Sequence, residues 1–178
     1  MPITPWKVLE SKYIHPRFRI DQCELPNGNS LEAMILEFRS WANILPVTRD
    51  HQAVLIRQYR HGVREVMWEI PGGVVEEGED PLEGARREML EETGYASSKI
   101  IQVGKCYPNP AFQTNTLYCF LALDAEQVTE QALDGAEEIE IHLLPVERIL
   151  PMIRNGEFLH ALQVVALIHA LTELEKLG

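Results

Sequence analysis

The segment from Asp80 to Gly94 constrains this chain most, because residue types alone mark both of its ends. Asp80 stands before Pro81, an order typical of a helix start, where a carboxylate caps the first N–H groups and proline fits the first turn. Gly94 follows Thr93 and suits the left-handed residue just past a helix end. We therefore predict a helix from Pro81 to Thr93.

Three carboxylates share one face of this predicted helix. Glu88, Glu91 and Glu92 stand at positions i, i+3 and i+4, and like charges so placed repel by about 0.2–0.5 kcal/mol per pair. A folded protein that keeps them together usually supplies a cation, and carboxylate oxygens suit Mg²⁺ or Mn²⁺. Charge-rich helix faces are also commonly just solvated, so the triplet alone leaves both interpretations open.

Short β-like runs separated by turns fill residues 6–59, and we interpret this half as antiparallel sheet. After the predicted helix, strand-like runs return at Ile100–Tyr107, Leu117–Leu123 and Ile139–Leu144. Two further helical stretches close the chain, the last over 158–177. Its apolar stripe predicts core packing or a dimer contact rather than a ligand role, and comprises Val164, Leu167, Ile168, Leu171 and Leu174.

The overall charge and the apolar pattern exclude several classes of function. A formal net charge of -11 argues against binding nucleic acid through its phosphates, which requires clustered Lys and Arg. No apolar run reaches the about 18 residues of a membrane helix. The start of the chain lacks a secretion signal, and the three cysteines show neither pairing nor metal spacing, so we expect a cytoplasmic protein with a small-molecule substrate.

The carboxylate triplet lies in a longer pattern of fixed spacing. The segment resembles the Nudix box, G-x5-E-x7-R-E-U-x-E-E-x-G-U, where U is a bulky apolar residue, and we identify the chain as similar to Nudix hydrolases. Tyr95 at the final U position is the only departure, and it affects packing behind the helix. The matching residues are Gly73, Glu79, Arg87, Glu88, Glu91, Glu92 and Gly94.

This resemblance implies a fold and a metal site. The fold would be α/β (α+β), an α/β/α sandwich around a mixed β-sheet. Glu88, Glu91 and Glu92 would hold Mg²⁺, which Mn²⁺ can replace, with help from the backbone carbonyl of Gly72. Glu79 and Arg87 would pair to brace the loop against the helix, while Gly73 would allow a tight backbone turn.

Hydrolysis of a diphosphate also needs a general base close to the attacking water. The resemblance implies two sources for this carboxylate. Glu91 on the helix is one, and the acidic loop before the strand at 139–144 is the other. Within that loop we favour Glu137 over its neighbour Glu138.

The flanks of the box resemble the ADP-ribose pyrophosphatase and nucleoside diphosphate sugar hydrolase branch of the family. The stretches 54–60 and 68–73 are similar to its lead-in, and Pro110 stands where that branch keeps a proline. Arg60 is our candidate for the substrate phosphates, because a guanidinium matches phosphate oxygens with paired hydrogen bonds. Further candidate substrate contacts are Arg57, Glu69 and Phe112, and Trp6 and Trp41 are candidates for stacking on a base.

The expected activity is Mg²⁺-dependent hydrolysis of ADP-ribose or a related nucleoside diphosphate sugar to a nucleoside monophosphate and a sugar phosphate. Two alternatives remain: a Nudix hydrolase for another nucleotide, and a module that senses a nucleotide without cutting it. Residues 1–45 resemble the N-terminal β arm that pairs across a two-fold axis in this branch. We therefore predict a homodimer, with residues 46–178 as the hydrolase domain.

Overall fold

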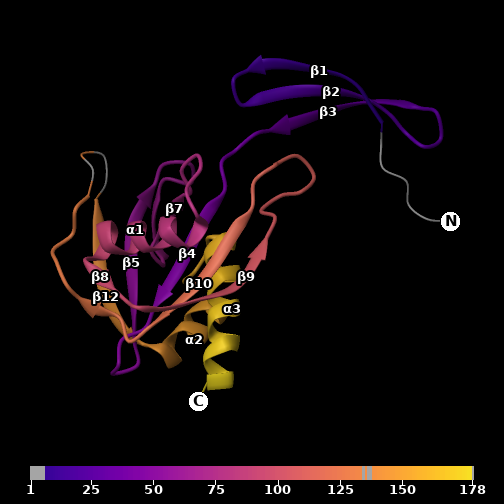
Figure 1. Ribbon diagram of the computed structural model, residues 1–178. Coiled ribbons are helices and arrows are strands. Elements are labelled where there is room, and N and C mark those ends of the chain that lie inside the picture. The colour runs from indigo at the N-terminus through magenta and orange to yellow at the C-terminus, as the bar shows by residue number, and fades with distance from the viewer. Residues whose placement is uncertain (1–6, 134, 136–137, 178) are drawn as a thin grey trace. The chain divides into compact units, whose positions relative to one another are not determined.

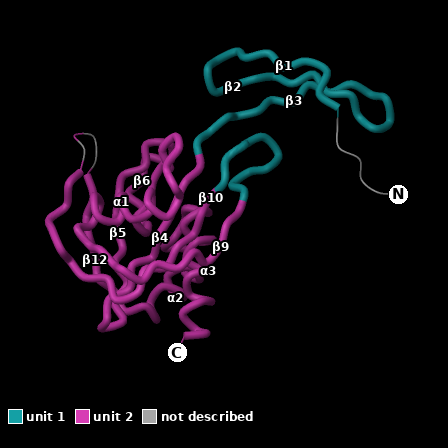
Figure 2. The backbone as a smooth tube through the Cα atoms, viewed as in Figure 1, with its two compact units in different colours: residues 1–39, 107–116 teal, residues 40–106, 117–178 magenta. Residues whose placement is uncertain are grey.

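The computed structural model describes residues 7–133, 135 and 138–177, and these fall into two compact units (Figure 2). The first unit contains the chain up to Arg39 together with Tyr107–Thr116. The second contains Ser40–Cys106 and the chain from Leu117 onward. The division of function between an arm over 1–45 and a domain over 46–178 stays a prediction.

The first unit is an antiparallel sheet of three strands in the order β1-β2-β3. The strands are β1 (Lys7–His15), β2 (Phe18–Glu24) and β3 (Ser30–Leu36). The turn between β2 and β3 contains Gly28 at φ 83°, a left-handed conformation that glycine adopts without steric cost. The loop 107–116 joins this unit through Leu36, whose N–H donates to the Phe112 carbonyl at 2.7 Å.

A buried carboxylate anchors this small sheet. Asp21 on β2 is 5% exposed, and it accepts hydrogen bonds from Ser11 Oγ at 2.6 Å and Arg19 Nε at 3.0 Å. Burial alone raises the pKa of Asp21, but the bonds from Ser11 and Arg19 outweigh it and hold that pKa below its ordinary value. By contrast, many apolar side chains of the sheet are exposed, namely Val8, Leu9, Tyr13, Ile14, Phe18, Leu31 and Met34.

Two sheets form the framework of the second unit (Figure 1). The four-stranded sheet has the order β7-β4-β10-β9, and the three-stranded sheet has the order β12-β5-β6. Their bounds are β4 (Trp41–Pro46), β5 (Gln52–Arg60), β6 (Glu65–Glu69), β7 (Gly72–Val74), β9 (Lys99–Cys106), β10 (Leu117–Leu123) and β12 (Ile139–Pro145). The short strands β8 (Tyr95–Ala96) and β11 (Glu126–Gln127) pair separately.

The four-stranded sheet is mixed, which corrects the expectation of an antiparallel N-terminal half. Strand β4 pairs antiparallel with β7 but parallel with β10, where Trp41 lies opposite Leu117. Residue periodicity shows which side chains share a face and does not show the direction of the partner strand. The direction of β10 relative to β4 depends on the long connection between these two strands, which contains much of the second unit.

Helices cover both faces of the mixed sheet. Helix α1 (Pro81–Thr93) packs on one face, where Ala42 and Ile44 of β4 form a buried cluster with Met89. Helices α2 (Ile149–Arg154) and α3 (Ala161–Leu177), the former preceded by the 3₁₀ turn η1 (Val146–Arg148), pack against the opposite cluster. The α/β/α sandwich around a mixed sheet is therefore confirmed. Within the described residues, no helix is long and apolar enough to cross a membrane.

Helix α3 differs in two ways from its prediction over 158–177. It begins at Ala161, because His160 Nδ1 accepts the backbone N–H of Leu162 at 3.3 Å, as a capping side chain does. Its buried face also differs from the expected apolar stripe, since Ile168 is 43% exposed. The buried residues of the helix are Gln163, Ala166, Leu167 and Ala170.

Candidate functional site

The ends of α1 fix the position of its carboxylates. The Asp80 side chain accepts the N–H of Leu82 at 2.8 Å, and Pro81 occupies the first turn. Gly94 adopts the left-handed conformation at φ 72°, and its N–H donates to the Leu90 carbonyl at 2.8 Å. The helix from Pro81 to Thr93 with these two caps is confirmed as predicted.

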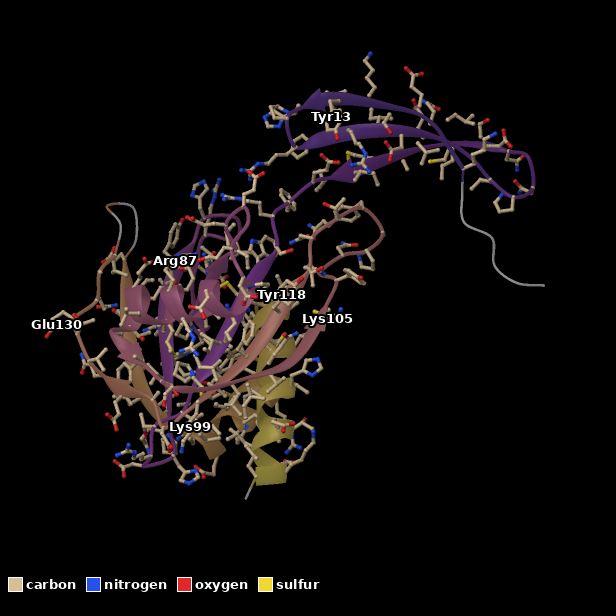
Figure 3. All side chains as sticks on the ribbon, in the orientation of Figure 1. Tyr13, Arg87, Lys99, Lys105, Tyr118 and Glu130 are labelled. Atoms are coloured by element: carbon tan, nitrogen blue, oxygen red, sulfur yellow. The ribbon has the colours of Figure 1, made fainter. Side chains whose placement is uncertain are left out.

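Glu88, Glu91 and Glu92 lie on one side of α1 but in different surroundings. Glu88 and Glu91 share the guanidinium of Arg87, the residue labelled in Figure 3. Its Nη1 donates to Glu88 Oε1 at 2.8 Å and to Glu91 Oε2 at 3.2 Å. Glu92 is only 4% exposed, and its Oε2 accepts the N–H of Gly72 at 2.8 Å. The side chains of Glu88 and Glu91 are 15% and 45% exposed, so the site opens to solvent beside Glu91.

A forked ion pair ties the loop before α1 to the helix, as the sequence pattern implied. Arg87 Nε donates to Glu79 Oε1 at 3.0 Å and Arg87 Nη2 to Glu79 Oε2 at 3.2 Å, while Nη2 also donates to the Val74 carbonyl. The hydrogen bonds from Arg87, followed by one from the Glu76 N–H, hold the pKa of Glu79 below its ordinary value. The contacts of Arg87 with Glu79, and then those with Glu88, raise the pKa of Arg87 further above its ordinary value.

Gly73 has a different role from the tight turn that we expected. It lies in β7, opposite Ala42 of β4, and has no positive φ. A side chain at this position would overlap the carboxylate of Glu88. The strand passes directly against the acidic helix face here, and the missing Cβ of glycine leaves room for Glu88 in its present position.

The carboxylates are not gathered into a ready-made cation cage. Among residues 7–133, 135 and 138–177, no group of three or more His, Cys, Asp or Glu side chains could hold a metal ion by itself. The reason lies in their present partners, since Glu88 and Glu91 turn to Arg87 and Glu92 turns to the Gly72 N–H. All candidate metal-ligand atoms of these side chains are oxygens. This suits Mg²⁺ bound by one or two carboxylates with water and substrate oxygens.

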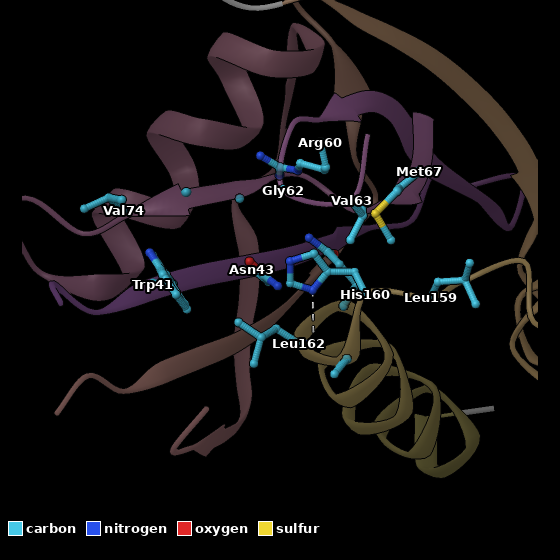
Figure 4. A pocket seen from close by; sticks show the side chains of 14 residues that line it. Trp41, Asn43, Arg60, Gly62, Val63, Met67, Val74, Leu159, His160 and Leu162 are labelled. Carbon is cyan, nitrogen blue, oxygen red and sulfur yellow. Dashed lines mark hydrogen bonds between the residues drawn. The ribbon is translucent and has the colours of Figure 1, made fainter. Parts of the chain in front are cut away.

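A cavity of about 550 Å³ opens next to the glycine strand β7 (Figure 4). Figure 4 shows Arg60, Trp41 and His160 projecting around this space from three different elements. The wall is mostly apolar, with a few polar groups among aliphatic and aromatic side chains, as is usual for small-molecule sites. Its side-chain lining includes Trp41, Asn43, Arg60, Val63, Met67, Val74, Leu159, His160, Leu162 and Gln163.

The structure separates the candidate substrate residues. Arg60 lines the cavity, whereas Arg57 lies three positions earlier on the same strand and therefore on the opposite face of β5. There the Arg57 guanidinium sits over the Trp68 ring at 5.5 Å and pairs with Glu140 at 3.5 Å. Glu69 is fully buried and accepts two hydrogen bonds from Arg60. Direct contact of Arg57 or Glu69 with substrate stays a prediction.

The roles of the remaining candidates stay predictions. Phe112 belongs to the first unit, where its carbonyl accepts the N–H of Leu36, and its contact with substrate stays a prediction. Glu137 and Trp6 lie outside the described residues. Glu138 is exposed just before β12. The choice of general base among Glu91, Glu137 and Glu138 therefore stays open.

Sequence analysis missed Asn43, His160 and Gln163. Asn43 and Gln163 are 5% and 3% exposed, and the residues on either side of each in the sequence are apolar. A polar residue on the buried face of an apolar strand or helix is the signal that could have found them. The ring of His169 on α3 packs against Gly104, where an added Cβ would come within 2.8 Å of the ring.

Comparison with known proteins bears on the family of this chain. The model of the NUDIX domain family matches residues 38–162. The ADP-ribose pyrophosphatase of Bacillus subtilis is 30% identical over 139 residues, which cover 78% of this chain and 75% of that protein. The GDP-mannose pyrophosphatase of Citrobacter koseri is 30% identical over 85% of this chain and 84% of its own length.

A solved structure supports the same fold. A crystal structure described as an ADP compounds hydrolase superposes with a TM-score of 0.87 and covers 100% of this chain and 98% of its own. At 21% identity it bears on the fold alone. The family match spans most of the chain and includes α1 with its caps and its carboxylates. This chain belongs to the Nudix family of hydrolases, and it resembles the ADP-ribose pyrophosphatase branch of that family.

Proposed function

We propose that this protein hydrolyses the diphosphate linkage of ADP-ribose or a related nucleoside diphosphate sugar, with Mg²⁺ as its cofactor. The products would be a nucleoside monophosphate and a sugar phosphate. The observation that carries this proposal is the position of Gly72 and Gly73. This short segment contacts the carboxylates of α1 and also lines the cavity that Arg60 enters.

The cavity has the size and chemistry for part of a nucleotide sugar. A volume of about 550 Å³ is within the range of small-ligand sites. Apolar walls suit a base or a sugar face, and the guanidinium of Arg60 suits the negative diphosphate. The relatives named as ADP-ribose and GDP-mannose pyrophosphatases support a substrate of this class.

Nudix hydrolases generally use divalent metal ions, and we assign the ligands here to Glu88, Glu91 and Glu92 with the Gly72 carbonyl. The oxygen-only donor set favours Mg²⁺, with Mn²⁺ as a substitute. When bound, the ion would supply positive charge near the diphosphate oxygens and favour ionisation of the attacking water. For the ligands to converge, Glu88 and Glu91 must exchange part of their contact with Arg87.

Protein side chains would bind the phosphates, accept the proton and hold the site together. Arg60 would donate N–H groups to a phosphate and hold the diphosphate beside β7. One carboxylate, from Glu91, Glu137 or Glu138, would accept the proton of the attacking water. The ion pair of Arg87 with Glu79 would hold the loop against the helix, so that these groups lie around the same phosphorus atom.

A substrate panel tests the proposal. The protein is incubated with Mg²⁺ and ADP-ribose, GDP-mannose, UDP-glucose or a nucleoside triphosphate, and phosphate is measured with and without added phosphatase. For the sugar substrates we expect phosphate only when both enzymes are present, and no release after chelation until Mg²⁺ or Mn²⁺ is restored. Turnover of triphosphates alone would favour another Nudix substrate, and binding without any turnover would favour a sensor.

We also propose a homodimer formed through the first unit. Its three-stranded sheet exposes large apolar side chains, among them Leu9, Ile14 and Met34, and large exposed apolar patches commonly mark an interface. Sedimentation of the purified protein should give the mass of two chains. Replacing Ile14 with Lys should shift the equilibrium toward single chains, and an unchanged mass would contradict this assignment.

A further inference from the structure

A buried amide of the C-terminal helix is connected to the arginine of the cavity. Gln163 on α3 is 3% exposed. Its Oε1 accepts the backbone N–H of Ile70 at 2.9 Å, and its Nε2 donates to Glu69 Oε2 at 3.1 Å. Both ends of this amide are therefore occupied, one by the last residue of β6 and the other by the residue that follows it.

Glu69 depends on such partners because it is fully buried. A carboxylate removed from water is costly unless hydrogen bonds and opposite charge compensate it. Arg60 Nε donates to Glu69 Oε1 at 2.6 Å and Arg60 Nη2 to Glu69 Oε2 at 2.5 Å. The Oε2 atom thus accepts from Arg60 and from Gln163 together, and the two donors fix its direction.

The guanidinium of Arg60 reaches the cavity from this buried support. Its side chain is 39% exposed, in contrast to the fully buried Glu69. A forked contact with a fixed carboxylate restricts the rotation of the guanidinium plane, since both of its N–H groups on one edge must stay aligned. The direction in which Arg60 faces the cavity is therefore set by the orientation of Glu69.

We infer that Gln163 is a positioning residue for substrate binding, acting through Glu69 to orient Arg60 toward the anionic part of a nucleotide substrate. This inference rests on the proposed function, because it assigns the phosphates of that substrate to Arg60. It gives α3 a part in the site, through Gln163, in addition to its packing on the sheet. The expected consequence is a change in substrate affinity rather than in the chemical step.

The decisive variant is Gln163→Met, which keeps the length of the side chain and removes both of its hydrogen bonds. Loss of a hydrogen bond to a charged group should raise KM for ADP-ribose by about tenfold or more, while kcat changes by less than about threefold, because binding in the ground state and transition state falls equally. The matched control is Gln102→Met, the same change at an exposed position of β9. It should leave KM unchanged.

A second variant keeps the inference testable if Gln163→Met folds poorly. Gln163→Glu retains an oxygen for the Ile70 N–H but places a carboxylate oxygen next to Glu69 Oε2. Circular dichroism and the unfolding midpoint identify the variants that are folded at the assay temperature. Gln163→Glu should also raise KM, and a folded Gln163 variant with the KM of the unchanged protein would overturn the inference.

A double-mutant comparison separates positioning from general destabilisation. Arg60→Lys keeps the positive charge but loses the forked contact. In that background Gln163→Met should add less than about threefold to KM, because residues of one network do not act independently. Fully multiplicative effects would overturn the inference. Absence of hydrolysis of ADP-ribose, GDP-mannose and UDP-glucose by the unchanged protein would instead refute the proposed function.

Discussion

Arg87 and Glu79 form a forked ion pair across the loop that leads into α1, with N–O distances of 3.0 and 3.2 Å. The same guanidinium donates to Glu88 and Glu91. One arginine therefore holds the loop closed and also neutralises the carboxylates proposed to bind metal. Its planar geometry serves both tasks, since each edge of the fork faces different acceptors.

Arg87→Lys should consequently lower the stability of the fold. An ammonium cannot form the fork with Glu79 while it donates to the Val74 carbonyl and Glu88, so hydrogen bonds to charged groups are lost. We expect the free energy of unfolding to fall by about 1–3 kcal/mol. Chemical denaturation measures this loss, and Arg86→Lys on the neighbouring helix position serves as the control. Equal stability of the two variants would contradict the bracing role of Arg87.

Glu92→Gln should lower kcat by about two to four orders of magnitude, the usual cost of removing a catalytic electrostatic group. The fold should persist, because the glutamine oxygen can still accept the Gly72 N–H that Glu92 binds. Glu83→Gln makes the same change on the first turn of α1, where the side chain is 63% exposed, and should leave kcat unaltered. Steady-state kinetics with ADP-ribose and Mg²⁺ compares the two.

Gly73→Ala should disturb catalysis more than folding. The added methyl group must displace the carboxylate of Glu88, because an ideal Cβ there overlaps it. A side-chain shift of about 1 Å in a catalytic group can lower activity by about a hundredfold. We expect kcat to fall on this scale, with a thermal unfolding midpoint close to that of the unchanged protein. Wild-type kcat in this variant would show that Glu88 does not act at its present position.

Asp21→Asn tests the anchor of the first unit and its pH dependence. Since the pKa of Asp21 is lowered in the folded state, its stabilising contribution is present above the unfolded value of about 3.9. That contribution is lost as pH falls through the lower folded value. Amide hydrogen exchange in β1 and β2 should therefore be faster in the variant at pH 7, and the difference should shrink toward acid.

The exposed Glu10 of β1 provides the comparison for this experiment. Glu10→Gln changes a carboxylate of the same sheet that has no buried partners to lose. It should leave the exchange rates of β1 and β2 unchanged at both pH values. Equal protection in the Asp21 and Glu10 variants would show that the buried carboxylate does not stabilise the sheet.

Sequence analysis was most informative where the signals are local. The cap at Asp80, the proline that follows it and Gly94 all act within one helix, so the bounds of α1 could be read directly. The Nudix pattern led to the family for the same reason, since its spacing lies within one segment. Tyr95, the one departure from that pattern, is 8% exposed and packs with Met89 behind the helix, as expected.

Long-range relationships could not be predicted in this way. The role of Gln163 depends on Glu69, which lies 94 residues earlier in the chain, and its neighbours on α3 are ordinary apolar residues. Arg57 and Arg60 were both candidate substrate contacts. Their different surroundings depend on side chains of other strands, Glu140 beside Arg57 and Glu69 beside Arg60. The burial of a side chain and the identity of its contact partner depend on the fold, and a single sequence indicates them only indirectly.

The parallel pairing of β4 with β10 has a consequence for how the chain folds. Strand β4 lies between β7 and β10, yet its partner β10 follows only after α1 and several further strands have been synthesised. Closing so long a segment before the pairing contributes stabilising contacts is entropically costly and slows folding. During synthesis, the edge of β4 that later pairs with β10 therefore stays unpaired until β10 has been made. In this interval the nascent protein most needs protection from aggregation.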